Sequence, residues 1–146
     1  MTRAGVFVDR IASAWLIRRF VDPEASFKFV PAQGYQPEAG ELRFDMFAAE
    51  YTHEGDRCTF EVLLDRFALG GDPALAVLAE IVHDVDIRDD KFGREDTPGV
   101  ARVLAGIAAA SDDDARRLER GAAVFDDLYA LFAREAAPLD ASRTRE

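Results

Sequence analysis

The sequence is short of positive charge, and this shortage narrows the functions that it can have. Its 18 lysine and arginine residues are outnumbered by 28 aspartate and glutamate residues, which gives a net charge of −10. Proteins that bind nucleic acids or anionic membranes without specificity need clustered positive charge. We therefore expect no direct nucleic-acid partner and no membrane partner.

The sequence also has little cysteine and no long hydrophobic run. Cys58 is the only cysteine, so the chain cannot form an internal disulfide, which is typical of proteins in a reducing cytoplasm. We find neither the apolar core of a signal peptide nor a membrane span. The expected localisation is cytoplasmic.

Apolar periodicity predicts an α+β fold, in which a small N-terminal β-sheet and a first packed helix are followed by a helical C-terminal half. Residues 4–9 (AGVFVD) and 26–31 (SFKFVP) are typical of short strands, and residues 10–21 of a helix. We expect a single domain over residues 1–135 and a polar, disordered tail over residues 136–146.

The helical half carries recognisable start signals. Asp72 followed by Pro73 is a strong one, because aspartate caps a helix and proline suits its first position. Thr59, Thr97 and Ser111 are further candidate caps. No internal repeat or interdomain linker interrupts this pattern.

The helix predicted over residues 10–21 is apolar on most sides, yet it contains arginines. At about 100° per residue, Arg18 falls in the same sector as Ile11 and Trp15. A guanidinium held against apolar groups stays charged and needs a partner. One interpretation is an ion pair with Asp22, four residues further on.

The other interpretation is an anion site. Arg18 would act with Arg10, Arg19 or Arg57, and together they would bind a tetrahedral oxyanion through charge-assisted hydrogen bonds. The strand-to-helix corner predicted here would add free backbone N–H groups. The sequence leaves both interpretations open.

The two histidines both stand next to acids, which suggests a metal site. Imidazole and carboxylate ligands suit zinc, iron or manganese, so a divalent metal is the expected cofactor of this alternative. No established zinc motif is present. The alternatives are a turn histidine at one position and an internal histidine–aspartate pair at the other. The candidate ligands are Asp45, His53, His83 and Asp86.

Four further residues are candidate members of the same polar pocket. Asp9 and Asp126 could serve as a base or as additional ligands, and Asp126 could equally pair with an arginine. Cys58 is either a small buried apolar residue or a nucleophile activated by His53. Trp15 would line the pocket.

Two long motifs and several short ones resemble the ChrB-type chromate-resistance domain. They are VDRIASAWLIRRFVDPEA (8–25), FD (44–45), HEGDRCTF (53–60), LAEIV (78–82) and FDDLY (125–129). The resemblance covers residues 3 to about 132. It implies an association with chromate resistance, and the longer members resemble regulators of a chromate-efflux operon. The family pattern includes Asp9, Arg10, Trp15, Arg18, Arg19, Asp22, Asp45, His53, Gly55, Asp56, Arg57 and Cys58.

Together these observations predict a sensor-like, ligand-binding domain of chromate resistance. Its pocket of arginine, histidine and aspartate side chains would bind a small oxyanion, a metal ion or both. A metal-dependent hydrolase or redox enzyme is one alternative, and a structural or interaction domain is another. Assembly into homo-oligomers also stays open.

Overall fold

The computed structural model describes residues 2–3, 8–27, 29–30, 55, 57–87 and 91–136. Helices make up most of these residues. In chain order the elements are β1 (Thr2–Arg3), α1 (Val8–Leu16), the π-helix η1 (Ile17–Val21), β2 (Phe29–Val30), α2 (Thr59–Arg66), α3 (Pro73–Ile87), α4 (Asp96–Ala110) and α5 (Asp114–Ala136).

The predicted α+β fold is wrong, because the described residues form an all-α fold. Their strands are two residues long each and pair in parallel, Thr2 with Phe29 and Arg3 with Val30. Val8 and Asp9, predicted to end a strand, form the first turn of α1. A short apolar run suits a buried helix as well as a strand, so periodicity alone misassigned it. Of the other predicted strand, residues 26–31, the structure has Phe29–Val30 as β2.

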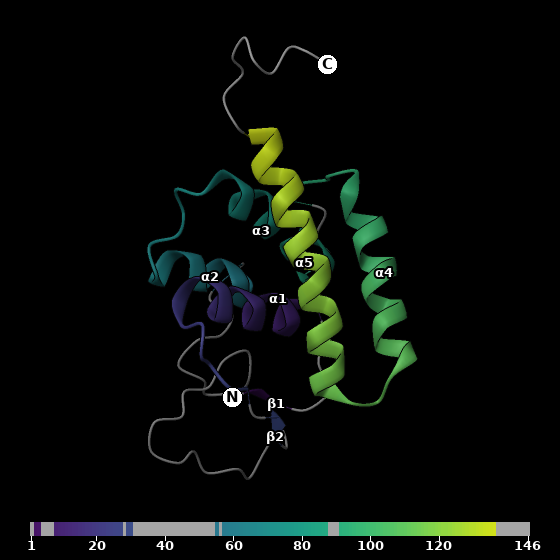
Figure 1. Cartoon of the computed structure of the whole chain (residues 1–146). Coiled ribbons are helices and arrows are strands. Elements are labelled where there is room, and N and C mark those ends of the chain that lie inside the picture. The colour runs from purple at the N-terminus through teal and green to yellow at the C-terminus, as the bar shows by residue number, and fades with distance from the viewer. Residues whose placement is uncertain are drawn as a thin grey trace.

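Helix α1 lies at the centre of the fold and packs against α2, α3 and α5 (Figure 1). Every residue of α1 after Val8 is buried. The longest helix, α5, runs across α1 and also contacts α3 and α4. No helix in the described part of the chain is long and apolar enough to cross a membrane.

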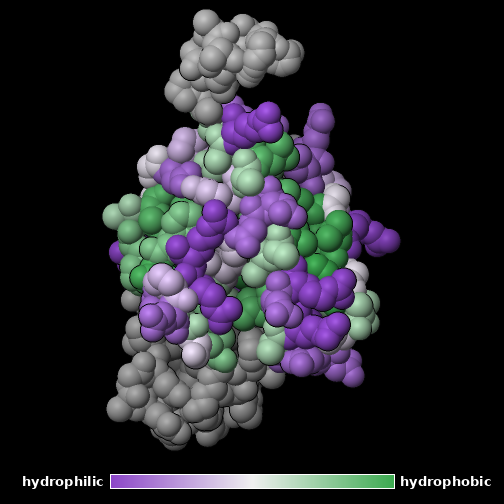
Figure 2. All heavy atoms as spheres, viewed as in Figure 1, coloured by the Kyte–Doolittle hydropathy of each residue, from purple (hydrophilic) through white to green (hydrophobic). Residues whose placement is uncertain are grey.

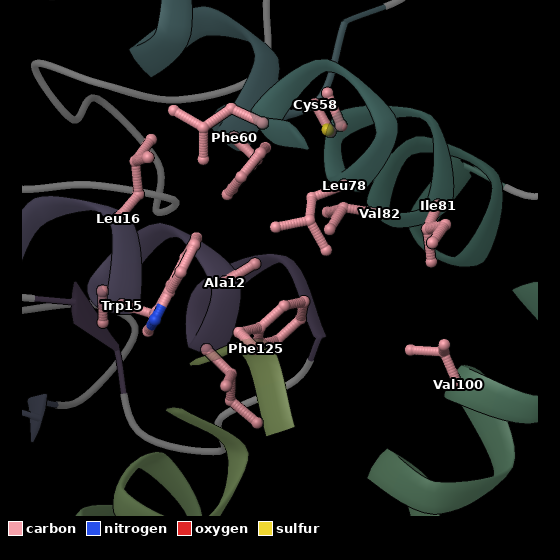
Figure 3. Close-up of a cluster of buried hydrophobic side chains, with 14 of the residues drawn as sticks. Ala12, Trp15, Leu16, Cys58, Phe60, Leu78, Ile81, Val82, Val100 and Phe125 are labelled. Carbon is pink, nitrogen blue, oxygen red and sulfur yellow. The ribbon is translucent and has the colours of Figure 1, made fainter. Parts of the chain in front are cut away.

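The hydrophobic core forms where these helices meet around α1. Figure 3 shows Ala12 and Trp15 of α1 close to Phe125 of α5, with Phe60 of α2 and Leu78 of α3 on the opposite side. The rings of Trp15 and Phe125 have centroids 5.8 Å apart. Aromatic side chains bury large apolar areas, so this cluster dominates the packing.

The predicted helix starts were correct only in part. Asp72 caps α3 as predicted, since its carboxylate accepts hydrogen bonds from the N–H groups of Ala74 and Leu75 at 2.9 and 3.3 Å. At α2 the cap is Cys58 rather than Thr59. Helix α4 begins at Asp96, one residue before the predicted cap.

Candidate functional site

The first helix changes its hydrogen-bonding pattern at Ile17. The N–H of Asp22 donates to the carbonyl of Ile17 at 2.7 Å, which is the i→i+5 bond of a π-helix. This wider turn changes the angle between successive side chains. Arg18 and Arg19 are exposed, although the spacing of a regular α-helix places Arg18 in the same sector as Ile11.

Arg18 is held in place without a carboxylate. Its Nε and Nη2 atoms donate to the carbonyl oxygen of Ala25 at 3.3 and 3.2 Å. Its guanidinium lies 4.7 Å from the ring centroid of Phe27. Asp22, the partner expected from the sequence, instead accepts a hydrogen bond from the N–H of Glu24. Within the described ranges no acidic side chain forms an ion pair with Arg18.

Two adjoining hollows share Arg18 and Phe27 in their walls. One, of about 310 Å³, reaches Trp15, Arg19 and Asp126. The other, of about 400 Å³, opens toward the start of α5. We refer to the pair as the arginine hollows. Their combined lining, with aromatic rings beneath a guanidinium, could receive a small anion.

Arg19 is neutralised by Asp126, unlike Arg18. Its Nη1 atom lies 2.5 Å from Oδ1 of Asp126, and the indole N–H of Trp15 donates to the same oxygen at 2.9 Å. The guanidinium also stacks 4.7 Å from the ring centroid of Tyr129. Asp126 therefore pairs with an arginine, which is one of the two roles that the sequence left open.

Tyr129 extends this network to the start of α3. Its hydroxyl donates to Oδ2 of Asp72 at 2.6 Å. That hydrogen bond raises the pKa of Tyr129, with burial and the negative charge of Asp72 adding to it and Arg19 partly opposing it. The network joins η1, α5 and the α3 cap into one rigid wall.

Asp9 is buried and holds α2 in position. Its carboxylate, only 1% exposed, accepts hydrogen bonds from the N–H groups of Thr59 and Phe60, both at 3.0 Å. These N–H groups belong to the first turn of α2, where the helix dipole favours a negative charge. Arg10 is also buried, at 4% exposure, so both charges of α1 lie inside the protein.

Cys58 is buried at the start of α2. It caps α2 and forms a capping box with Glu61, whose Oε1 accepts from the N–H of Cys58 at 2.9 Å. Burial raises the pKa of the Cys58 thiol far above its usual range, and the nearby charges of Asp9 and Glu61 raise it further. A thiol that keeps its proton is a poor nucleophile and a poor metal ligand.

Two of the four candidate metal ligands, His83 and Asp86, lie on α3, and the other two fall outside the described residues. His83 is fully buried, and its Nδ1 lies 2.7 Å from Oε1 of Glu61. Asp86 is half-buried at the end of α3. Asp45 and His53 fall outside the described residues, so the predicted set stays a prediction. Among the residues that are described, no group of three or more histidine, cysteine or acidic side chains is placed to bind a metal ion.

Arg57, the last candidate anion ligand, lies near an acid of α2. Its guanidinium is 3.8 Å from Asp65, and the two side chains are 38% and 66% exposed. A pair of this kind contributes little to stability. Arg10 and Arg57 do not contribute to the described walls of the arginine hollows.

Sequence reasoning missed two acids that the structure shows to be important. Glu61 joins the Cys58 cap to His83, and Asp84 accepts hydrogen bonds from the N–H groups of Phe92 and Gly93 at 3.1 and 2.8 Å. The position of Glu61, three residues after a cap, is the signal of a capping box and could have identified its first role. Its contact with His83, 22 residues away, has no local signal.

The described residues form a small helical domain with two hollows, lined by polar and apolar side chains, at the end of its first helix. The model of the ChrB C-terminal domain matches residues 1–132, and the chain belongs to that family. The family resemblance inferred from the motifs is thus confirmed, together with its association with chromate resistance.

A curated relative supports the same assignment. Protein ChrB of Cupriavidus metallidurans is 39% identical over 132 residues, which cover 90% of this chain and 40% of that protein. The chain therefore spans well under half of that relative's length. No solved structure matches the chain.

Proposed function

We propose that this domain binds a small tetrahedral oxyanion in the arginine hollows and thereby acts as the ligand-sensing part of a chromate-resistance system. The observation that carries the proposal is the state of Arg18. Its guanidinium is fixed by Ala25 and Phe27 and has no acidic partner among the described residues. Such a positioned charge loses little side-chain entropy when it binds an anion.

The surroundings of Arg18 favour a small anion over a large polyanion. Arg116 adds a second positive charge to the wall of the larger hollow. Asp113 also lines that hollow, Glu119 lines both, and Asp126 in the smaller one is paired with Arg19. A compact dianion can approach Arg18 and Arg116 closely. An extended polyanion would also meet Glu119 and the overall charge of −10.

Trp15 provides the signal for a direct test. It is the only tryptophan and lines the smaller hollow. We would titrate the protein with sulfate and molybdate by fluorescence, and with chromate by calorimetry because chromate absorbs light. Saturable binding is expected, and Arg18→Gln should weaken it at least about tenfold, since it removes a charge-assisted contact.

The matched control is Arg134→Gln, which removes the same charge from the exposed last turn of α5. It should change the affinity by less than about twofold, because a distant exposed charge is screened by salt. The proposal fails if no anion binds saturably at millimolar concentration. It also fails if the two variants weaken binding equally, since binding would then depend only on net charge.

A further inference from the structure

A third hollow lies on another side of α1, between α1, α3 and α4. It has a volume of about 630 Å³ and is lined mainly by apolar side chains, among them Ile11, Val85, Ala101, Leu104 and Ala108. We call it the α4 hollow. Sites for small organic ligands typically have this size and this apolar character, with a few polar groups that orient the ligand.

One polar group in the α4 hollow has no partner. The hydroxyl oxygen of Thr97 is buried, and nothing in the described part of the protein forms a hydrogen bond with it. Thr97 was predicted to cap α4, but the helix begins one residue earlier and leaves the hydroxyl without that role. A buried hydroxyl without a hydrogen bond is costly, so it needs an explanation.

The remaining polar groups of the α4 hollow indicate what kind of ligand would give the Thr97 hydroxyl a hydrogen-bond partner. Asp84 already accepts hydrogen bonds from the backbone of Phe92 and Gly93. Arg102 contributes a positive charge, and within the described residues no acid pairs with it. The groups that face a ligand are a hydroxyl donor and a guanidinium, which suit a negatively charged acceptor, and the Asp84 carboxylate, whose charge the N–H groups of Phe92 and Gly93 partly offset.

We infer that the α4 hollow binds a small monocarboxylate with an apolar body. Its carboxylate accepts hydrogen bonds from Thr97 and Arg102, and its hydrocarbon part lies against the alanine and leucine side chains of α4. This site is separate from the arginine hollows, because no residue lines both. It therefore does not depend on oxyanion binding.

Nuclear magnetic resonance with labelled alanine methyl groups tests the inference on the intact chain. Ala101, Ala105 and Ala108 all line the hollow. We would titrate straight-chain carboxylates from hexanoate to dodecanoate, and the matching alcohols as uncharged controls. These methyl signals should shift saturably, with tighter binding for longer chains until the hollow is filled, and weaker binding for the alcohols.

Two variants separate the proposed contacts from general hydrophobic binding. Thr97→Val keeps the shape but removes the hydroxyl, and Arg102→Gln removes the charge. Each should weaken carboxylate binding about tenfold, while Arg134→Gln leaves it unchanged. Unchanged affinity in both variants, or no saturable shift of the three methyl signals at millimolar ligand, overturns the inference.

The ligand-free protein gives an independent readout. If the Thr97 hydroxyl has no partner, Thr97→Val should raise the melting temperature, because it removes an unsatisfied buried polar group. A lower melting temperature would mean that the hydroxyl already has a partner, and the inference would fail. A purely structural threonine would not combine higher stability with weaker ligand binding.

Discussion

The two parts of the first helix, α1 and η1, differ in the exposure of their charged residues. In α1 the charged residues Asp9 and Arg10 are buried, and Asp9 holds the start of α2. In η1 no residue is fully buried, and Arg18 and Arg19 are exposed. The change from i→i+4 to i→i+5 hydrogen bonding marks the boundary. Stability should therefore depend more on the buried charges of α1 than on those of η1, which are open to solvent.

The surfaces of α4 and α5 differ in a similar way. Charged residues cover much of the exposed face of α5, while apolar and small residues are common on α4 (Figure 2). Val103 of α4 is 52% exposed. The proposed oxyanion site adjoins α5, with its charged surface, and the proposed carboxylate site adjoins α4, with its apolar surface.

Replacing the buried acid of α1 should have the largest effect on stability. In Asp9→Asn, an amide group replaces one of the oxygens that accept from the N–H groups of Thr59 and Phe60. The variant also loses the charge at the start of α2. We expect a loss of about 3 kcal/mol in the free energy of unfolding, measured by urea denaturation.

The control for this prediction is Asp22→Asn at the end of η1. Its carboxylate is exposed and accepts one hydrogen bond, from the N–H of Glu24. The expected loss is below about 1 kcal/mol. Equal losses in the two variants would contradict the distinction between the two parts of the helix.

The raised pKa of the Cys58 thiol, which lies beside Asp9, predicts a loss of stability at alkaline pH. The pKa of its thiol is raised in the folded protein, whereas in the unfolded chain the pKa is about 8.5. Below that pH both states keep the proton, and this contribution to stability is complete. Above it only the unfolded state loses the proton, so stability should fall by about 1.4 kcal/mol per pH unit.

Urea denaturation between pH 8 and pH 10 measures this slope. The control is Cys58→Ser, because serine also caps helices but does not ionise in this pH range. The raised pKa of Tyr129 acts in the same direction, but only near pH 10 and above. The slope should largely disappear in the variant below that pH. An identical slope in both proteins would mean that Cys58 ionises normally in the folded state.

A close contact between α5 and α1 predicts a smaller loss in the free energy of unfolding. A methyl group added at Gly121 of α5 would lie 2.5 Å from Cγ2 of Ile11, which is buried and branched at that point. Gly121→Ala should gain about 1 kcal/mol from helix propensity but lose more through overpacking, for a net loss of about 1 kcal/mol. Thermal denaturation would measure it.

Gly106 of α4 provides the matched substitution. No atom lies within 4 Å of the methyl group that alanine would add there. Gly106→Ala should therefore stabilise the protein by about 0.5 to 1 kcal/mol. If both substitutions stabilise, Ile11 can move aside, and α1 is less tightly held than its burial indicates.

Much of the family assignment and part of the fold could be predicted from the sequence. The long motifs around Trp15 and Cys58 identified the family, and Asp72 with Pro73 located the start of α3. These signals are local, since each depends on residues adjacent in the chain. The same local reasoning assigned residues 4–9 to a strand, because a short apolar run does not distinguish a strand from a buried helix.

The site was harder to predict because its key contacts join distant parts of the chain. Asp9 contacts the start of α2, 50 residues away, and Trp15 donates to Asp126, 111 residues away. The π-helix is a second reason. It has no signal in the sequence pattern. The spacing of an ideal α-helix placed Arg18 with Trp15, and the two do line one hollow, but Arg18 is exposed rather than held against the core.

The smallest effect is expected for the ion pair of η1. Arg19 and Asp126 are 40% and 53% exposed, so solvent screens their attraction. Arg19→Gln should lower the free energy of unfolding by less than about 1 kcal/mol, and the difference should vanish in about 1 M salt. The loss in Asp9→Asn should persist there, because its hydrogen bonds are buried. A salt-resistant loss in Arg19→Gln would instead show that the charges of η1 support the folded state as strongly as those of α1.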